Sequence, residues 1–345
     1  MRALLMDEIA GPLAVREVRD PVAPDAGVVV RVMATGLCRS DWHAWAGHDE
    51  ISLPHVPGHE LAGIVDAVGA GVTRWSPGDR VTVPFVCGCG RCEWCLSGNA
   101  QVCPDQQQPG FTHWGSFAER VALHGADTNL VAIPDGVSFE AAASLGCRFA
   151  TAYRALTARA RLRAGESLTV VGAGGVGLSC VQVGVALGAD VTVVDRTERS
   201  LVLAASLGAV RTVLATSDAD PAETVQRLTG GTHVAVDAVG SEQTSATAIH
   251  SLRRRGRHVQ VGLLPPVDGH PRVPMDRVIA WELDVLGSHG MAAADYPAML
   301  ELIAVGVLRP DLLVERVVGL EDAATLLPGL GSASPAGITL VDPRR

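Results

Sequence analysis

The chain has 345 residues, of which 48% are hydrophobic and 19% are charged, and its formal net charge is −9. This length exceeds what one hydrophobic core usually holds and predicts two domains, while the acidic balance argues against nucleic acid or an anionic membrane as a partner. All 28 basic residues are arginines, which excludes a Walker P-loop and Schiff-base chemistry because both need lysine.

The first 150 residues are predicted to form an irregular, β-rich domain. Short valine-rich runs separated by Gly, Pro and Asp predict strands at 28–33, 63–68 and 80–84. From about residue 163 strands and helices alternate, with strands predicted at 167–172, 190–195, 211–214, 233–237, 257–262 and 283–287, and helices at 176–187, 198–207 and 242–254. This alternation predicts a doubly wound parallel sheet, the second part of an α/β fold. After residue 292, a helix at 296–304 and short Val- and Leu-rich pieces indicate that the chain returns to the first domain.

No targeting or membrane segment is recognisable. The N-terminus reaches Asp7 and Glu8 before an apolar run can form, and the most apolar stretch, residues 168–194, is interrupted by glycines. We therefore expect a cytoplasmic protein with no membrane association.

Four cysteines are clustered with the spacing C-x2-C-x2-C-x7-C, namely Cys89, Cys92, Cys95 and Cys103. Four thiolates on a short loop complete a tetrahedral shell around one zinc ion and leave no position for substrate, so this spacing predicts a structural zinc site. The alternative, two disulfides of a secreted domain, fits poorly with a chain of this length that has no export signal.

A glycine-rich turn predicts a dinucleotide site. The segment Gly172-Ala173-Gly174-Gly175-Val176-Gly177 follows a predicted strand and opens a predicted helix, where a pyrophosphate can sit on the helix N-terminus. Asp195 ends the next strand, where a carboxylate accepts hydrogen bonds from the adenosine ribose and repels a 2′-phosphate, so NAD is favoured over NADP. Arg196 and Arg199 soften that preference, and the alternative interpretation of Asp195 is a residue that caps the following helix.

Cys38, His59 and Cys147 are the remaining candidates for a second metal site. Two cysteines and one histidine with an open fourth position are an established catalytic zinc set. The alternative for each lone cysteine is a buried structural thiol, and the spacing does not show that the three residues converge.

These motifs together resemble the medium-chain zinc-dependent alcohol dehydrogenase family over essentially the whole chain. The family pattern G-H-E-x2-G-x5-G-x2-V is met by Gly58, His59, Glu60, Gly63, Gly69 and Val72, and Pro77-Gly78-Asp79-Arg80-Val81 follows it. The resemblance implies a GroES-like catalytic domain at 1–150 with a structural-zinc lobe at 87–103. It also implies a Rossmann NAD-binding domain at 151–288 and a C-terminal segment, 289–345, that completes the catalytic domain.

The resemblance also implies residue roles. Cys38, His59 and Cys147 would bind the catalytic zinc, with Glu60 behind it as a possible further ligand and Asp41 orienting His59. Ser40 would accept the substrate's hydroxyl proton and pass it through the cofactor ribose to His43. The other implied contacts are with the cofactor, through Arg39 at the pyrophosphate, Thr151 at the nicotinamide, Arg196, Val261 and Leu263.

The implied activity is hydride transfer between NAD(H) and a primary or secondary alcohol, or the aldehyde or ketone, through a zinc-bound alkoxide with two zinc ions per chain. Trp45, Phe85 and Trp114 are candidates for the substrate pocket, as is Leu263, and the family implies a homodimer or homotetramer. The alternatives are a polyol dehydrogenase, against which Cys147 argues, and another reductase of the superfamily. A zinc-ribbon interaction protein would be the non-enzymatic alternative.

Overall fold

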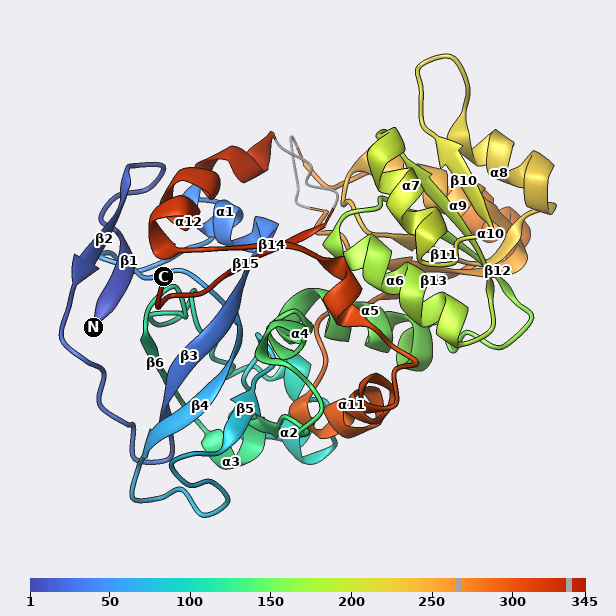
Figure 1. The fold of residues 1–345 in the computed structure, drawn as a ribbon. Helices are drawn as coiled ribbons and strands as arrows, with labels where there is room; N and C mark the ends of the chain where they lie inside the picture. The colour runs from blue at the N-terminus through green and yellow to red at the C-terminus, as the bar shows by residue number, and fades with distance from the viewer. Residues whose placement is uncertain (265–268, 333–336) are drawn as a thin grey trace. The chain divides into compact units, whose positions relative to one another are not determined.

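The computed structural model describes residues 1–264, 269–332 and 337–345 and divides into two compact units. One unit comprises Met1–Ala150 and Gly290–Arg345, and the other comprises Thr151–His289 (Figure 1). The predicted fold class, a β-rich domain together with a doubly wound parallel-sheet domain, is confirmed.

The first unit is built on a seven-stranded, mainly antiparallel sheet. The strand order is β14-β15-β3-β4-β5-β7, and β6 pairs with β3 outside this path. Buried valines of β3 and β4 form its core with residues of β5 and β6, and a separate pair, β1 and β2, packs against α12. The strands are β1 (Arg2–Met6), β2 (Leu13–Glu17), β3 (Val28–Leu37), β4 (Glu60–Val68), β5 (Arg80–Thr82), β6 (Arg120–Leu123), β7 (Val131–Ala132), β14 (Val314–Val318) and β15 (Ile338–Val341).

Short helices interrupt this unit. The strand-rich pattern did not predict those within residues 1–150, whereas the helix predicted at 296–304 is confirmed. The helices are α1 (Arg39–Trp45), α2 (Glu93–Leu96), α3 (Ala126–Asn129) and α4 (Phe139–Ala143), followed by α11 (Tyr296–Ala304) and α12 (Leu320–Leu326). The C-terminal segment adds two strands to the sheet, because β15 pairs antiparallel with β3 and β14 pairs parallel with β15. The path from β3 straight into α1, and β4 beginning at Glu60, bring residues 37–41 and 58–60 side by side.

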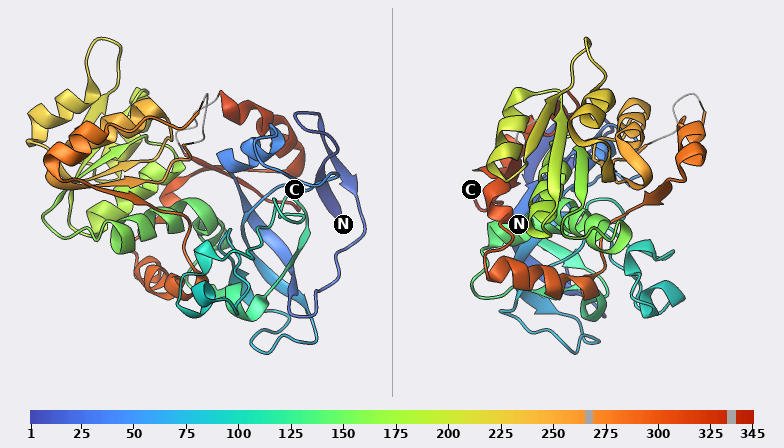
Figure 2. Two further views of the ribbon diagram at one scale, coloured as in Figure 1. Left: turned by 180° about the vertical axis from the view of Figure 1, so that it is seen from behind. Right: turned by 90° about the vertical axis from the view of Figure 1, so that its right-hand side faces the viewer.

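The second unit is a six-stranded parallel sheet in the order β10-β9-β8-β11-β12-β13. The strands are β8 (Ser167–Val171), β9 (Asp190–Asp195), β10 (Arg211–Leu214), β11 (Thr232–Asp237), β12 (Leu252–Gln260) and β13 (Asp284–Gly287). Helices α6 (Gly175–Ala186) and α7 (Glu198–Ser206) cover one face, and α8 (Pro221–Thr229), α9 (Glu242–His250) and α10 (Met275–Trp281) cover the other (Figures 1 and 2). Parallel strands place their carboxyl ends at one edge, so the segments after β8, β9, β11 and β12 share that edge.

One predicted helix is wrong at its end. The helix predicted at 242–254 stops at His250, and residues from Leu252 onward belong to β12. Leu252 pairs with Thr232 of β11 across a bulge, and the sheet pairing overrides the helix propensity of the arginines that follow. Helix α8 has readable signals that the prediction did not use, because Asp220 caps its start, Pro221 is its first residue and Gly230 ends it in the left-handed conformation.

Among the described residues, no helix is both long and apolar enough to cross a membrane.

Candidate functional site

The cysteine quartet converges on one point of the first unit. The sulfur atoms of Cys89, Cys92, Cys95 and Cys103 all lie within 4.8 Å of one another. Cys92 and Cys95 lie at the start and inside the short helix α2, while Cys89 and Cys103 flank it. All eight cysteines are free thiols, and the 3.7 Å between the Cys92 and Cys103 sulfurs is far longer than a disulfide bond. The geometry is that of a four-sulfur metal site.

Backbone donors stabilise negative charge in this group. N–H groups of Arg91 and Cys92 point at the Cys89 sulfur and lower its pKa to about 6, whereas desolvation raises the pKa of Cys95 to about 12. Four closely spaced sulfurs cannot all ionise without a compensating cation, because each thiolate repels the next. A bound Zn²⁺ would supply that charge.

The second group brings together residues that are far apart in the sequence. Donor atoms of Cys38, His59, Glu60 and Cys147 lie within 4.8 Å of one another. Cys38 ends the β3–α1 junction, His59 and Glu60 stand at the start of β4, and Cys147 lies in a π-helical turn, Leu145–Phe149. The carbonyl of Gly146, next to Cys147, accepts the Phe85 N–H at 3.0 Å and the Tyr296 hydroxyl of α11 at 3.4 Å. The predicted ligand set therefore converges, and π-helical turns are frequent at functional sites.

Asp41 holds two of these residues in place. Its Oδ2 accepts the Cys38 backbone N–H at 2.9 Å, and its Oδ1 accepts the Gly58 N–H at 3.1 Å and His59 Nδ1–H at 2.9 Å. Asp41 and His59 are fully buried. With its proton on Nδ1, His59 turns Nε2 toward the sulfurs, and Nε2 is buried without a hydrogen-bond partner. An unpartnered imidazole nitrogen beside two thiols is what a bound zinc ion would satisfy.

The thiols of Cys38 and Cys147 shift each other's pKa in opposite directions. A hydrogen bond from Cys147 and the charge of Arg148 lower the pKa of Cys38 well below that of a free thiol, although burial opposes this. The hydrogen bond of Cys147 to Cys38, and its burial, raise the pKa of Cys147. A bound divalent cation would favour the thiolate form of both cysteines.

The glycine turn of the second unit follows β8 as predicted. The reason why glycine is suited differs from one position of the turn to the next. Gly172 has φ +95°, and a Cβ on Gly177 would lie 1.7 Å from the Gly172 carbonyl, so both are required by the turn itself. A Cβ on Gly174, at the N-cap of α6, would meet no protein atom within 4 Å. The protein's own packing does not require glycine at this position, whereas close approach of a pyrophosphate to the helix N-terminus does.

Asp195 lies at the carboxyl end of β9, beside the turn. Its Oδ2 accepts the Ala173 N–H at 2.7 Å, and its Oδ1 accepts the N–H and hydroxyl of Thr197, each at 2.9 Å. Thr197 is the N-cap of α7, so Asp195 makes the contact with the helix start that was the alternative interpretation. Its hydrogen bond from Ala173 also links Asp195 to the glycine turn. Arg196 follows directly, and Val261 and Leu263 follow β12 at the same edge of the sheet.

Comparison with known proteins shows the family to which the chain belongs. Residues 24–135 match the family described as alcohol dehydrogenase GroES-like domain, and residues 175–305 match zinc-binding dehydrogenase. An alcohol dehydrogenase of Geobacillus stearothermophilus is 34% identical over 325 residues, covering 93% of this chain and 94% of that protein. The chain belongs to the medium-chain zinc-dependent alcohol dehydrogenase family.

Solved structures agree with this. A structure described as an NAD-dependent alcohol dehydrogenase has a TM-score of 0.89 and 32% identity, and alcohol dehydrogenase TADH from Thermus sp. ATN1 has a TM-score of 0.90 and 31% identity. Each comparison covers 99% of both chains. The protein is therefore a zinc-dependent alcohol oxidoreductase.

The remaining residues predicted for the proton path and for cofactor contacts lie in helices α1 and α5 (Ala150–Arg154). Ser40 is in the first turn of α1, and the Cys38 thiol donates a hydrogen bond of 3.8 Å to its Oγ. Arg39 begins α1, and Thr151, largely buried, lies in α5 of the second unit. His43 lies one turn further along α1 than Ser40.

The aromatic residues predicted for the substrate pocket have different partners in the structure. Phe85 lies beside His59, with ring centroids 6.2 Å apart. Trp45 instead packs against the β1 core and donates its indole N–H to the Gly11 carbonyl at 2.8 Å, and Trp114, partly exposed, donates to the Pro54 carbonyl at 2.9 Å. Phe111, which the sequence did not single out, is closer to His59 than Phe85 is, at 5.2 Å.

Two further polar residues were missed by the sequence analysis. His48 contacts His43, with 2.8 Å between their Nδ1 atoms, so one ring donates to the other. Burial, and then the charge of His48, lower the pKa of His43 and keep its imidazole neutral near pH 7. Arg148 pairs with Glu60 beside the ligands. The readable signal was a cation directly after Cys147 in an otherwise apolar run.

Cys87 and Cys180 stand outside both groups. Each is buried, and burial raises the pKa of each thiol to about 12. Cys87 belongs to the β-sheet core and Cys180 to the buried side of α6. Both are inert packing residues.

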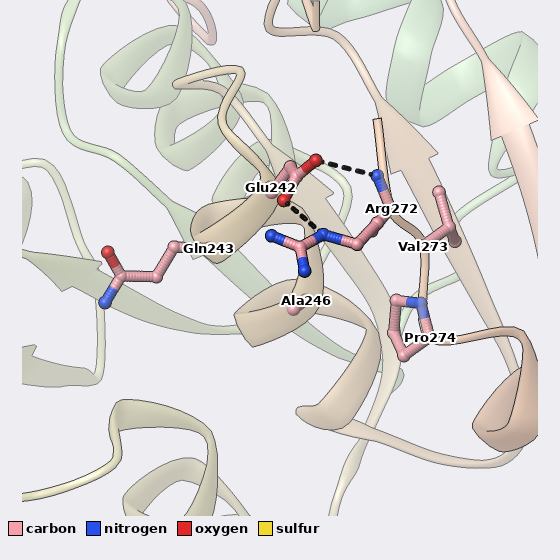
Figure 3. Close-up of a pocket in the computed structure, with 6 residues that line it drawn as sticks. All are labelled: Glu242, Gln243, Ala246, Arg272, Val273 and Pro274. Atoms are coloured by element: carbon pink, nitrogen blue, oxygen red, sulfur yellow. Dashed lines mark hydrogen bonds and ion pairs between the residues drawn. The ribbon is translucent and has the colours of Figure 1, made fainter. Parts of the chain in front are cut away.

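An open pocket elsewhere on the second unit does not involve the predicted site residues. It is lined by Glu242, Gln243, Ala246, Arg272, Val273 and Pro274. As Figure 3 shows, Glu242 forms an ion pair with Arg272, with 3.1 Å between the Glu242 Oε2 and Arg272 Nε atoms. Among the described residues that line the pocket, Glu242 and Arg272 are the charged ones, and they pair with each other.

The first prediction concerns the quartet. Cys92→Ser removes one sulfur from a closed site, so we expect about one zinc ion fewer per chain and a thermal midpoint lower by about 5–15 °C. Cys180→Ala, which removes a buried thiol outside both groups, serves as the control and should leave the zinc content unchanged. A Cys92→Ser protein with wild-type zinc content and thermal midpoint would contradict a structural role for the quartet.

Proposed function

We propose that this family member is an NAD-dependent alcohol dehydrogenase whose catalytic zinc is held by Cys38, His59 and Cys147. The observation that supports this most directly is the convergence of two sulfurs on the buried, unpartnered His59 Nε2, in a group of which Cys147 alone is partly exposed. Three protein ligands leave one position of a tetrahedral zinc ion open for substrate. The Cys89–Cys103 quartet offers no such position and would hold a second, structural zinc.

Zinc at the three-ligand site would act as a Lewis acid toward an alcohol or carbonyl oxygen, and NAD would carry the hydride. The protein's residues have separate tasks. Asp41 fixes the His59 tautomer, and Phe85 and Phe111 lie against the His59 ring and limit access of water. Ser40 would accept the hydroxyl proton of the alcohol, with His43 and His48 further out along α1 and the loop after it.

The proposal includes the substrate class, the oligomeric state and the cellular location. The substrates would be small alcohols, aldehydes or ketones, in keeping with the names of the relatives. We further propose a homodimer or homotetramer located in the cytoplasm. Family membership over both units favours the enzyme over a zinc-ribbon interaction protein.

The second prediction tests the function directly. The purified protein should reduce NAD in the presence of primary or secondary alcohols and contain about two zinc ions per chain. Cys38→Ser should lower kcat/KM by ~10³-fold or more and remove about one zinc ion, because it breaks the open site and not the quartet. Wild-type turnover by Cys38→Ser, measured by absorbance of NADH, would contradict the proposed function.

The third prediction concerns cofactor choice. Asp195→Asn keeps the shape and an acceptor oxygen for Ala173 but removes the negative charge, so the NADP-to-NAD ratio of kcat/KM should rise by about 10-fold or more. Asp190→Asn, at the opposite end of β9, is the matched control and should leave the ratio unchanged. A wild-type preference for NADP would show that Asp195 does not select the cofactor.

The fourth prediction concerns the proton path. Ser40→Ala should lower kcat for alcohol oxidation by ~10²–10⁴-fold with zinc content unchanged, whereas Ser40→Thr, which keeps a hydroxyl, should retain most activity. His43→Gln should lower kcat by less than Ser40→Ala does. Added buffer base should partly restore the kcat of His43→Gln, because solvent bases can replace the outer end of the proton path. Full activity of Ser40→Ala across the pH range would exclude this role.

A further inference from the structure

Glu60 is the fourth member of the catalytic ligand group, yet its carboxylate is already engaged. Arg148 donates Nε–H to Oε1 at 2.9 Å, and its backbone N–H donates to the same oxygen at 3.1 Å. Nη2 of Arg148 pairs with Oε2, and Nη1 donates to the Leu37 carbonyl at 3.4 Å. Both ends of the pair are buried, with Glu60 fully buried and Arg148 only 7% exposed.

The surrounding chain is shaped to hold this pair. Gly36 of β3 lies opposite Glu60 in the sheet, and a Cβ there would come within 2.1 Å of Glu60 Oε2 and 2.7 Å of Arg148 Nη2. The π-helical turn of residues 145–149 carries Cys147 and Arg148 as neighbours, so a ligand and the cation beside it are positioned by one element. The bidentate geometry is one that arginine makes and lysine does not.

Charge explains why a cation is needed at this point. Two thiolates and one carboxylate would carry one negative charge more than Zn²⁺ neutralises, and Cys38 and Glu60 are buried while Cys147 is partly buried. The guanidinium supplies the missing positive charge and also occupies the carboxylate oxygens.

A free carboxylate at this place would compete with substrate. Carboxylate oxygens are ordinary zinc ligands, and an oxygen of Glu60 lies within 4.8 Å of the other donor atoms. We propose that Arg148 is a positioning residue that holds the Glu60 carboxylate outside the zinc coordination sphere and so keeps the fourth position open for the alcohol or carbonyl substrate. This inference rests on the proposed function, since it presupposes zinc bound by Cys38, His59 and Cys147.

The test uses the metal itself as the reporter. Cobalt(II) substituted for the catalytic zinc has a visible spectrum that differs between four and five ligands. In Arg148→Met the freed Glu60 should bind the metal, so the spectrum should change toward five-coordinate, and kcat/KM should fall ~10–100-fold. Removal of zinc by a chelator should be no faster than in the wild type, because the metal gains a ligand and loses a neighbouring cation.

A second variant separates positioning from simple damage. Arg148→Met combined with Glu60→Gln removes both charges, should restore the wild-type cobalt spectrum and should recover most of the lost kcat/KM. If Arg148→Met alone does not fold, the wild type and this double variant carry the comparison, since both leave the metal without Glu60 and should have the same spectrum. Arg257→Met is the matched control, because Arg257 also pairs with a glutamate, Glu166, and binds two backbone carbonyls, those of Ala160 and Arg161, in the other unit.

The outcomes distinguish the two proposals. An unchanged cobalt spectrum in a folded Arg148→Met protein, or faster loss of zinc from it, would overturn the role of Arg148 and leave the proposed function standing. A wild-type spectrum that differs from that of the double variant would also overturn it, because Glu60 would then be a ligand. Absence of a metal sensitive to Cys38→Ser in the wild type would overturn the proposed function and this inference with it.

Discussion

The hydrogen bonds of the Asp41 carboxylate are the interactions on which the proposed catalytic group of Cys38, His59 and Cys147 depends. One buried side chain accepts hydrogen bonds from the Cys38 backbone, the Gly58 backbone and the His59 ring. It thereby ties the end of β3 and the start of α1 to the start of β4, and it orients a ligand at the same time. Since Asp41 is fully buried, each of these donors is needed to compensate its lost hydration. The geometry of the ligands is therefore coupled to the folding of this junction.

The negative charge of the two cysteine groups in the first unit is compensated in different ways. The quartet lies on a short loop and helix, where three of its four cysteines are partly exposed and backbone N–H groups stabilise the Cys89 sulfur. The Cys38 group is more deeply buried, with Cys147 alone partly exposed, and its charges are those of the side chains of Asp41 and Glu60 against that of Arg148. A closed and partly solvated site suits a structural ion, whereas a more deeply buried site with fixed charges strengthens electrostatic effects on a bound substrate.

Much of this arrangement could be predicted from local patterns. The glycine turn, the strands of the parallel sheet, the helix at 296–304 and the spacing of the quartet are each written within a few consecutive residues. The helix end at His250 could not be predicted, because the pairing of Leu252 with Thr232 decides it across the sheet. Arg148, His48 and Phe111 were missed for the same reason, since their partners Glu60, His43 and His59 become neighbours only in the folded chain. Trp45 and Trp114 were proposed for the pocket because they fall near positions that line it in the family, and the structure shows that each donates a hydrogen bond to a backbone carbonyl.

The glycines of the nucleotide turn show how structural and functional requirements can be separated within one motif. Gly172 and Gly177 are fixed by the protein, through a positive φ and through contact of the helix with the turn. Gly174 has open space where its side chain would be, so a Cβ there would clash with no protein atom but would reduce the room for a molecule that approaches the N-terminus of α6. The same distinction applies to Gly36 in the first unit, where a side chain would meet Glu60 and Arg148 and not a ligand. A glycine whose missing side chain faces protein is thus explained by packing, whereas the open space at Gly174, the N-cap of α6, leaves room for a molecule bound at the helix N-terminus.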